Sequence, residues 1–216
     1  AAQKGTGKWT ADEALNTGTD ASLLASSVFA RFMSAIKDQR TIASDILTYS
    51  APEFKVEDKK VFVETVRKAL YASKIIAYAQ GFDLLKNAGA EYGWDLQFGD
   101  IARVFREGCI IRAKFLNRIA AAYETNPSLS NLMIDGSFKD SLLEYQPALR
   151  EITALAIQQG ISVPSFTTAI SYFDAYRTKD SSANLIQAQR DYFGAHTYER
   201  NDREGHFHTE WYEDNE

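Results

Sequence analysis

The stretch VRKALYASKIIAYAQGFDLLK, Val66–Lys86, decides the fold. It forms the second half of a helix predicted over residues 56–86, and its apolar side chains fall on nearly every side of that helix. A helix that is apolar on most sides belongs in the middle of a bundle. Gly89 and Gly93 mark the predicted end of the helix and a turn.

Helical periodicity continues on both sides of this stretch. Apolar residues recur at steps of three and four over residues 21–47, and Asp20 is placed to cap that helix. The other predicted segments are residues 100–123 with a break at Gly108, a short helix capped by Ser128 and running to Ile134, and helices over 138–159, 165–177 and 181–193. No strand–helix alternation and no G-x-G-x-x-G motif appears, so we expect an all-α fold without a dinucleotide-binding sheet.

The C-terminal end differs in character from the helical part. Beyond Gly194 the sequence is polar, aromatic and aperiodic, which predicts an extended tail over residues 195–216. We therefore divide the chain into one helical domain, residues 1–194, and the tail.

Composition limits the kind of protein this is. The 216 residues are 45% hydrophobic and 25% charged, which is typical of a soluble globular domain. The net charge of −5 argues against general affinity for nucleic acid, and no apolar run approaches the roughly 18 residues that span a membrane. A single cysteine, Cys109, and the lack of a signal peptide lead us to expect a cytoplasmic protein. Because no Met begins the sequence, we expect a fragment or a processed chain.

The N-terminal segment KGTGKW carries the first candidate site. Lys4, Thr6 and Lys8 alternate with Gly5 and Gly7, so that charge, hydroxyl and accessible backbone N–H groups converge in the manner of an anion-binding loop. It is not a Walker A loop, because no Ser or Thr follows its second lysine. The alternative is a flexible start with its lysines in solvent.

Arg31 is the second candidate. It stands among apolar residues of the helix predicted over 21–47, where a guanidinium must reach the surface or find an anionic partner. That partner is either an internal carboxylate or a ligand phosphate, which arginine grips through two parallel hydrogen bonds.

Histidines near the C-terminus form the remaining candidates. Arg190 and His196 lie six residues apart across Gly194, and His196 is either a proton-exchanging group or a structural histidine. His206 and His208 alternate in the tail but lack a third ligand at suitable spacing, so we predict no metal site. We interpret Cys109 as a small buried hydrophobic residue.

Six segments together resemble one known family. They are KGTGKWT (4–10), SVFARFMSAIKDQR (27–40), ALYASKIIAYAQGF (69–82), WDLQFGDIARVFREGCIIRAKFL (94–116), NLIQAQRDYFGAHTYER (184–200) and GHFHTEW (205–211). They match, in order and over nearly the whole chain, the C-terminal region of 6-phosphogluconate dehydrogenase, and the short tail is most similar to bacterial forms. The resemblance implies the multi-helix, substrate-binding and dimer-forming domain of that enzyme.

The resemblance also implies an activity for the longer enzyme. The family oxidises 6-phosphogluconate with NADP, releases CO2 and forms ribulose 5-phosphate without a metal, as part of the pentose phosphate pathway. Its NADP-binding domain and its general acid and base precede the region matched here. The resemblance therefore implies no catalytic, cofactor-binding or metal-binding residue in this chain, which we expect to be inactive alone.

Five residues of this chain match family positions that bind the substrate. The resemblance implies that Lys4, Thr6 and Arg31 contact the substrate phosphate in their own subunit. It implies that Arg190 and His196 reach the partner's site in a homodimer that exchanges tails. A phosphomonoester carries roughly −1.5 to −2 charge near neutral pH, which such a cationic set would balance.

One tract departs from the family pattern. Residues 16–22 contain Gly18-Thr19-Asp20 where the family usually has a Gly-Val-Pro-like link, which leaves the course of the chain into the Arg31 helix open. Two alternatives remain: a non-catalytic helical oligomerisation module, and another hydroxyacid dehydrogenase of related architecture. The latter would lack both the Arg190–His196 pair and the tail.

Overall fold

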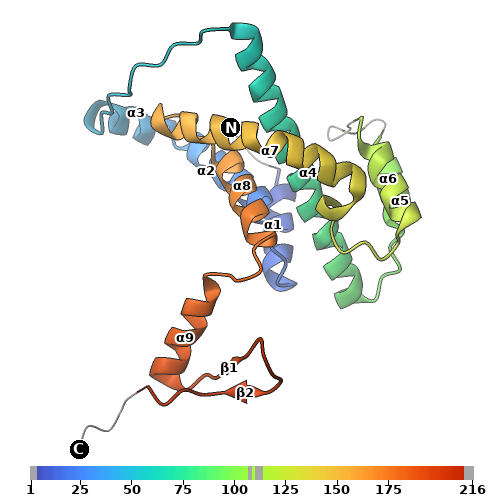
Figure 1. The fold of residues 1–216 in the computed structure, drawn as a ribbon. Helices are drawn as coiled ribbons and strands as arrows, with labels where there is room; N and C mark the ends of the chain where they lie inside the picture. The colour runs from blue at the N-terminus through green and yellow to red at the C-terminus, as the bar shows by residue number, and fades with distance from the viewer. Residues whose placement is uncertain (1–3, 107–108, 110–113, 212–216) are drawn as a thin grey trace, which may run out of the picture. The chain divides into compact units, whose positions relative to one another are not determined.

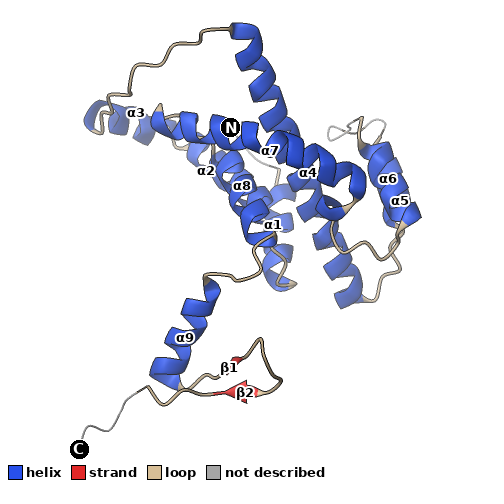
Figure 2. Ribbon diagram, viewed as in Figure 1, coloured by secondary structure: helices blue, strands red, loops and turns tan. Residues whose placement is uncertain are grey.

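The structure is a computed structural model that describes residues 4–106, 109 and 114–211. The chain divides into two compact units, one ending at Phe173 and the other beginning at Asp174. The first is built from helices and the second contains a helix and a short hairpin (Figures 1 and 2), which confirms the predicted all-α class for the chain. The boundary drawn from sequence lies at Gly194, whereas the compact second unit also contains the helix before it.

The first unit is a helical bundle around its longest helix. Its elements are α1 (Thr6–Asn16), α2 (Ser22–Ala35), α3 (Lys37–Ile46), α4 (Lys59–Tyr92), α5 (Phe98–Val104), α6 (Leu116–Thr125), the 3-10 helix η1 (Leu132–Ile134), α7 (Gly136–Gln158) and most of α8 (Pro164–Tyr176). Helix α4 contacts α1, α2, η1 and α7. The bundle-centre prediction for Val66–Lys86 is therefore confirmed.

The core follows the apolar pattern of α4. Six of its apolar side chains are at most 2% exposed: Ala69, Ala72, Ile75, Ile76, Ala79 and Phe82. Asp58 caps the helix by accepting the backbone N–H groups of Lys60 and Val61, and Gly93 ends it with φ 69°. Glycine suits that end because a left-handed backbone strains other residues.

Helix α7 provides the opposite side of this core. Its Phe138, Leu142 and Leu149 are at most 1% exposed. Asp135 caps the helix, and Gly160, with φ 67°, follows its last turn as the sequence predicts.

The helix predicted over residues 21–47 is broken in two. The backbone leaves helical geometry at Ile36, with φ −88° and ψ 51°, between α2 and α3. Two side-chain hydrogen bonds lie near the break: the Ser34 hydroxyl donates to the Arg31 carbonyl at 2.8 Å, and Arg40 donates to the Ser34 carbonyl, one of the last four carbonyls of α2. Serine hydroxyls compete with backbone donors in this way, a local effect that periodicity does not show.

One other local prediction needs correction. Ser128 does not cap the short helix, because its hydroxyl donates to Asn126 instead. The cap is Asn131, whose side-chain oxygen accepts the Met133 N–H at 2.8 Å. The helix predicted over 100–123 appears as α5 and α6, and its expected break at Gly108 lies outside the described residues.

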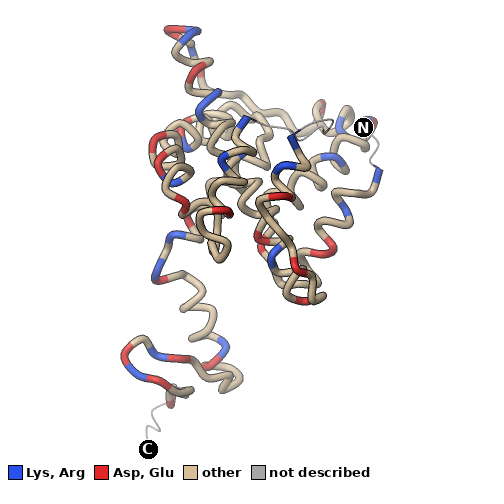
Figure 3. Tube along the Cα trace, turned by 90° about the vertical axis from the view of Figure 1, so that its right-hand side faces the viewer, with Lys and Arg blue, Asp and Glu red and all other residues tan. Residues whose placement is uncertain are grey.

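The second unit contains the end of α8, α9 (Ala183–Gly194) and two short strands, β1 (Tyr198–Glu199) and β2 (His206–Phe207). The strands pair antiparallel, with Tyr198 opposite Phe207 and Glu199 opposite His206. The tail over its described residues thus contains a hairpin rather than extended chain alone. Figure 3 shows basic and acidic positions interspersed along both units, so neither is strongly basic.

Candidate functional site

The N-terminal candidate segment begins a helix. Gly5 takes the N-cap position with φ 97°, and its carbonyl accepts the first helical hydrogen bond, from the Trp9 N–H at 3.0 Å. The backbone N–H groups of the first turn of a helix have no partner within the helix, and they favour an anion. Lys4 and Thr6 are exposed beside this turn. The predicted anion-binding loop is therefore the start of α1.

Gly7 has a structural role that the sequence did not indicate. A Cβ atom placed on Gly7 would lie 2.9 Å from Cγ2 of Val28 on α2, closer than real Cβ contacts. Glycine at this position therefore lets α1 and α2 approach closely, in addition to the anion contact inferred from the sequence.

The same contact sets the register between the two candidate elements. Helices α1 and α2 follow each other across a short turn and pack antiparallel, with Ala14 beside Ala21 and Leu24. Lys4 lies three residues before Gly7, and Arg31 lies three residues after Val28, on the same helix face. The N-terminal lysine and Arg31 therefore lie toward the same end of this helix pair.

We predict that Gly7→Ala destabilises the α1–α2 pair by about 1 to 3 kcal/mol, because overpacking costs this much. In a Val28→Ala background the added methyl has room, and the greater helix propensity of alanine should make Gly7→Ala neutral or favourable. Urea unfolding of the four proteins of this double-mutant cycle measures the difference. Equal costs in both backgrounds would show that the Val28 contact does not select glycine.

Arg31 reaches the surface rather than being buried. Its side chain is exposed, and the apolar neighbours Phe29, Phe32 and Met33 are 61%, 41% and 56% exposed. An internal carboxylate is thus not required to offset burial, and a guanidinium on an exposed apolar helix is accessible to a ligand.

A residue that the sequence analysis missed, Gln80, holds the start of this helix. Its side chain is fully buried on α4; its oxygen accepts the Leu23 N–H at 3.0 Å, and its nitrogen donates to the Ser22 hydroxyl at 3.2 Å. The predicted cap, Asp20, accepts the Ser22 N–H at 2.9 Å, although the N-cap position itself is Ala21. A polar residue inside the apolar stretch of α4 was the signal that pointed to Gln80.

The departure from the family pattern at residues 16–22 is held by α4 as well. Asn87 donates to the Thr19 hydroxyl at 2.8 Å, and the hydroxyls of Thr17 and Thr19 are 2.9 Å apart. These bonds define the course of the chain into α2.

The other predicted pair lies in the second unit. Arg190 is exposed on α9, and His196 is exposed in the turn that follows. The residues on either side of His196, Ala195 and Thr197, both have positive φ, 49° and 62°. A Cβ atom on Gly194 would lie 2.8 Å from the His196 ring, so a larger residue here would displace the His196 side chain from its observed position.

Asp191, beside Arg190, is the second residue that sequence reasoning missed. Its side chain is fully buried and accepts four hydrogen bonds: from the N–H groups of Thr197 and Thr209 at 3.0 Å, and from His208 Nδ1 and Trp211 Nε1 at 2.9 Å. Burial by itself raises the pKa of this carboxyl, but its four donors outweigh burial and hold the pKa well below its usual range. The carboxylate is therefore ionised throughout the neutral range.

The contacts of His208 bear on the weak metal motif. His208 pairs with Asp191, and His206 lies 3.9 Å from Glu199. Among the described residues no group of three or more His, Cys, Asp or Glu side chains is arranged to hold a metal ion. Cys109 is half-buried rather than fully buried.

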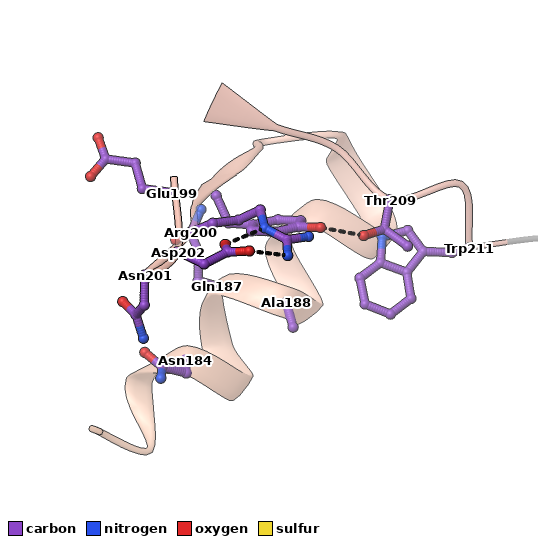
Figure 4. Close-up of a pocket in the computed structure, with 10 residues that line it drawn as sticks. Asn184, Gln187, Ala188, Glu199, Arg200, Asn201, Asp202, Thr209 and Trp211 are labelled. Atoms are coloured by element: carbon purple, nitrogen blue, oxygen red, sulfur yellow. Dashed lines mark hydrogen bonds and ion pairs between the residues drawn. The ribbon is translucent and has the colours of Figure 1, made fainter. Parts of the chain in front are cut away.

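A pocket of about 530 Å³ lies between α9 and the hairpin (Figure 4). Arg200 pairs with Asp202 at 2.7 and 2.8 Å at its wall, and the hydroxyls of Tyr198 and Thr209 are 2.7 Å apart. Neither Arg190 nor His196 lines this pocket, so it is separate from the predicted site residues.

Comparison with known proteins shows the family of this chain. Residues 1–211 match the family described as 6-phosphogluconate dehydrogenase, C-terminal domain. The chain belongs to the 6-phosphogluconate dehydrogenase family. The predicted resemblance is confirmed.

Relatives and a solved structure agree with this assignment. The NADP(+)-dependent, decarboxylating 6-phosphogluconate dehydrogenase of Bacillus subtilis is 56% identical over 213 residues, which is 98% of this chain and 45% of that protein. The decarboxylating enzyme of Escherichia coli is 55% identical over 212 residues, with the same shares. The 6-phosphogluconate dehydrogenase of Plasmodium falciparum, described in apo form and with NADP+ and 6-phosphogluconate, has a TM-score of 0.92 and 43% identity, covering 98% of this chain and 45% of that one.

The chain thus spans about 45% of the length of these dehydrogenases. In the part of the chain that the structure describes, no helix is long and apolar enough to cross a membrane.

Proposed function

We propose that this chain is the 6-phosphogluconate-binding and dimer-forming part of an NADP-dependent, decarboxylating 6-phosphogluconate dehydrogenase that acts in the cytoplasm. The observation that carries the proposal is the close contact between Gly7 and Val28, because it orients the start of α1 and Arg31 toward one end of a helix pair. A helix N-terminus with a lysine, a threonine and an arginine suits a phosphate dianion.

In this proposal the chain binds substrate and the chemistry takes place elsewhere in the enzyme. Lys4, Thr6 and Arg31 hold the phosphate, and Arg190 and His196 hold the substrate from the partner subunit. The NADP-binding domain and the groups that move protons belong to the rest of the dehydrogenase. Oxidation to a keto acid and loss of CO2 then yield ribulose 5-phosphate, and no metal is involved.

Exposed apolar surface supports the dimer. Large apolar side chains of α3 are exposed to solvent, with Ile42 63% and Ile46 70% exposed. On α9, Leu185 and Phe193 are 76% and 66% exposed. Contiguous apolar surface on a domain often marks an interface, and Ile42 and Ile46 lie one turn apart on the same face of α3. We propose that a second copy of the chain covers it and that the tail crosses between subunits.

The test is a chimera in which this chain replaces the matched segment of the Bacillus subtilis relative. We expect the chimera to reduce NADP with 6-phosphogluconate, and gluconate to bind at least about 30-fold more weakly because it lacks the phosphate. The 216-residue chain alone should give no NADPH. Equal affinity for gluconate would contradict the phosphate site, and turnover by the chain alone would contradict the division of roles.

A further inference from the structure

The second unit is organised around a carboxylate rather than an apolar core. Among its described residues, 174–211, Asp191 is the only one that is buried. The four hydrogen bonds of its carboxylate come from the turn after α9 and from the far end of the hairpin. A unit with no buried apolar side chain depends on such polar contacts for its internal order.

These bonds act directly on the turn that carries His196. The Asp191 carbonyl accepts the Ala195 N–H at 2.9 Å, and its carboxylate accepts the Thr197 N–H at 3.0 Å. Gln187 donates to the Thr197 carbonyl from one turn earlier on α9. His196 therefore stands between two anchored residues, Ala195 and Thr197, which both take a left-handed backbone that non-glycine residues rarely adopt without such support.

The arrangement of donors requires an ionised carboxylate. Oδ1 faces Thr197 and His208, while Oδ2 faces Thr209 and Trp211. Both backbone N–H groups and the Trp211 ring N–H can only donate. An asparagine of the same shape would turn an NH2 group toward one of these pairs and leave donors unpaired.

We propose that Asp191 is a positioning residue for substrate binding, which fixes the His196 turn relative to Arg190 and holds the hairpin to α9. The inference rests on the proposed function, in which Arg190 and His196 contact 6-phosphogluconate. Asp191 itself is buried and does not touch substrate. Its role is to set the geometry of the pair before the substrate arrives, so that binding does not have to order the turn.

The experiment uses the full dehydrogenase chimera. Asp191→Asn should raise the KM for 6-phosphogluconate about 10- to 100-fold, because misplacement of a contact group by about 1 Å has effects of this size. The KM for NADP should stay unchanged. Trp211→Phe removes a single donor and keeps a ring, so it should raise the KM for 6-phosphogluconate by a smaller factor, about 2- to 10-fold.

Asp202→Asn is the matched control, since Asp202 is an exposed carboxylate at the hairpin tip in the same unit. It should leave the KM for 6-phosphogluconate within about 2-fold of wild type, as surface substitutions usually do. A wild-type chimera that does not bind 6-phosphogluconate would overturn the proposed function. A wild-type chimera that binds, together with unchanged KM values in the Asp191→Asn and Trp211→Phe proteins and only a smaller amount of active enzyme, would overturn the positioning role alone.

Discussion

Dehydrogenase chimeras carrying Arg31→Ala or Arg190→Ala are each expected to lose at least about 30-fold in kcat/KM, and a mixture of the two is expected to regain activity. Removing one arginine from a charge-assisted contact to phosphate typically costs 2 kcal/mol or more, which corresponds to that factor. The regain depends on which subunit provides each arginine.

If the tail crosses between subunits, each site combines Arg31 of one protomer with Arg190 of the other. A mixed dimer then has one site that lacks both arginines and one site that is complete. In a random one-to-one mixture about half of the dimers are mixed, so about a quarter of all sites are complete. We expect the mixture, after subunit exchange, to show about a quarter of the wild-type kcat, with the wild-type KM for 6-phosphogluconate.

The alternative arrangement gives a different result. If each tail serves its own subunit, every site in a mixed dimer lacks one arginine and no activity returns. Arg67→Ala is the control for loss of an exposed arginine, because Arg67 pairs with Glu64 at 2.6 Å on α4 and has no place in the proposed site. Its kcat/KM should stay close to wild type, and a 30-fold loss there would remove the argument for Arg31.

Phe138→Ala is expected to destabilise the first unit by about 3 to 5 kcal/mol, the usual cost of truncating a fully buried aromatic residue. Phe138 is 0% exposed, its ring meets Phe115 edge to face at 6.1 Å, and the Arg118 guanidinium lies 4.6 Å from its centroid. The truncation leaves a cavity at the centre of the core and removes the ring beneath Arg118.

Urea unfolding followed by far-ultraviolet circular dichroism measures this loss. Leu143→Ala is the control on the same helix, because Leu143 is 59% exposed and its truncation should change stability by about 0.5 kcal/mol or less. Similar losses for the two variants would show that α7 does not pack with Phe138 inward.

Much of the fold was predictable because helical periodicity is a local property. The apolar stretch of α4 and the end of α7 before Gly160 follow from residues within a few turns of one another, whereas α4 continues through Gly89 to Tyr92, beyond its predicted end. The break at Ile36 was missed because the apolar pattern continues across it, and side-chain hydrogen bonds to single carbonyls near the break leave no trace in that pattern.

The residues of the candidate site could be predicted from the sequence. The residues that hold them in position could not. A polar or charged residue among apolar or glycine residues can be recognised from the sequence alone. This is how we identified Lys4, Arg31, Arg190 and His196. Whether these residues bind 6-phosphogluconate remains a prediction.

The sequence by itself determined the helical class, the central position of Val66–Lys86 and, by resemblance, the family. Tertiary structure alone decided three things. Gly7 leaves space for the Val28 side chain, and Gln80 binds the start of α2 from 57 residues away. Asp191 accepts hydrogen bonds from donors as far as 20 residues along the chain. The physical reason is common to all three. Close contacts and buried hydrogen bonds need partners brought together by the chain's path through space, and no spacing along the sequence indicates which residues will meet.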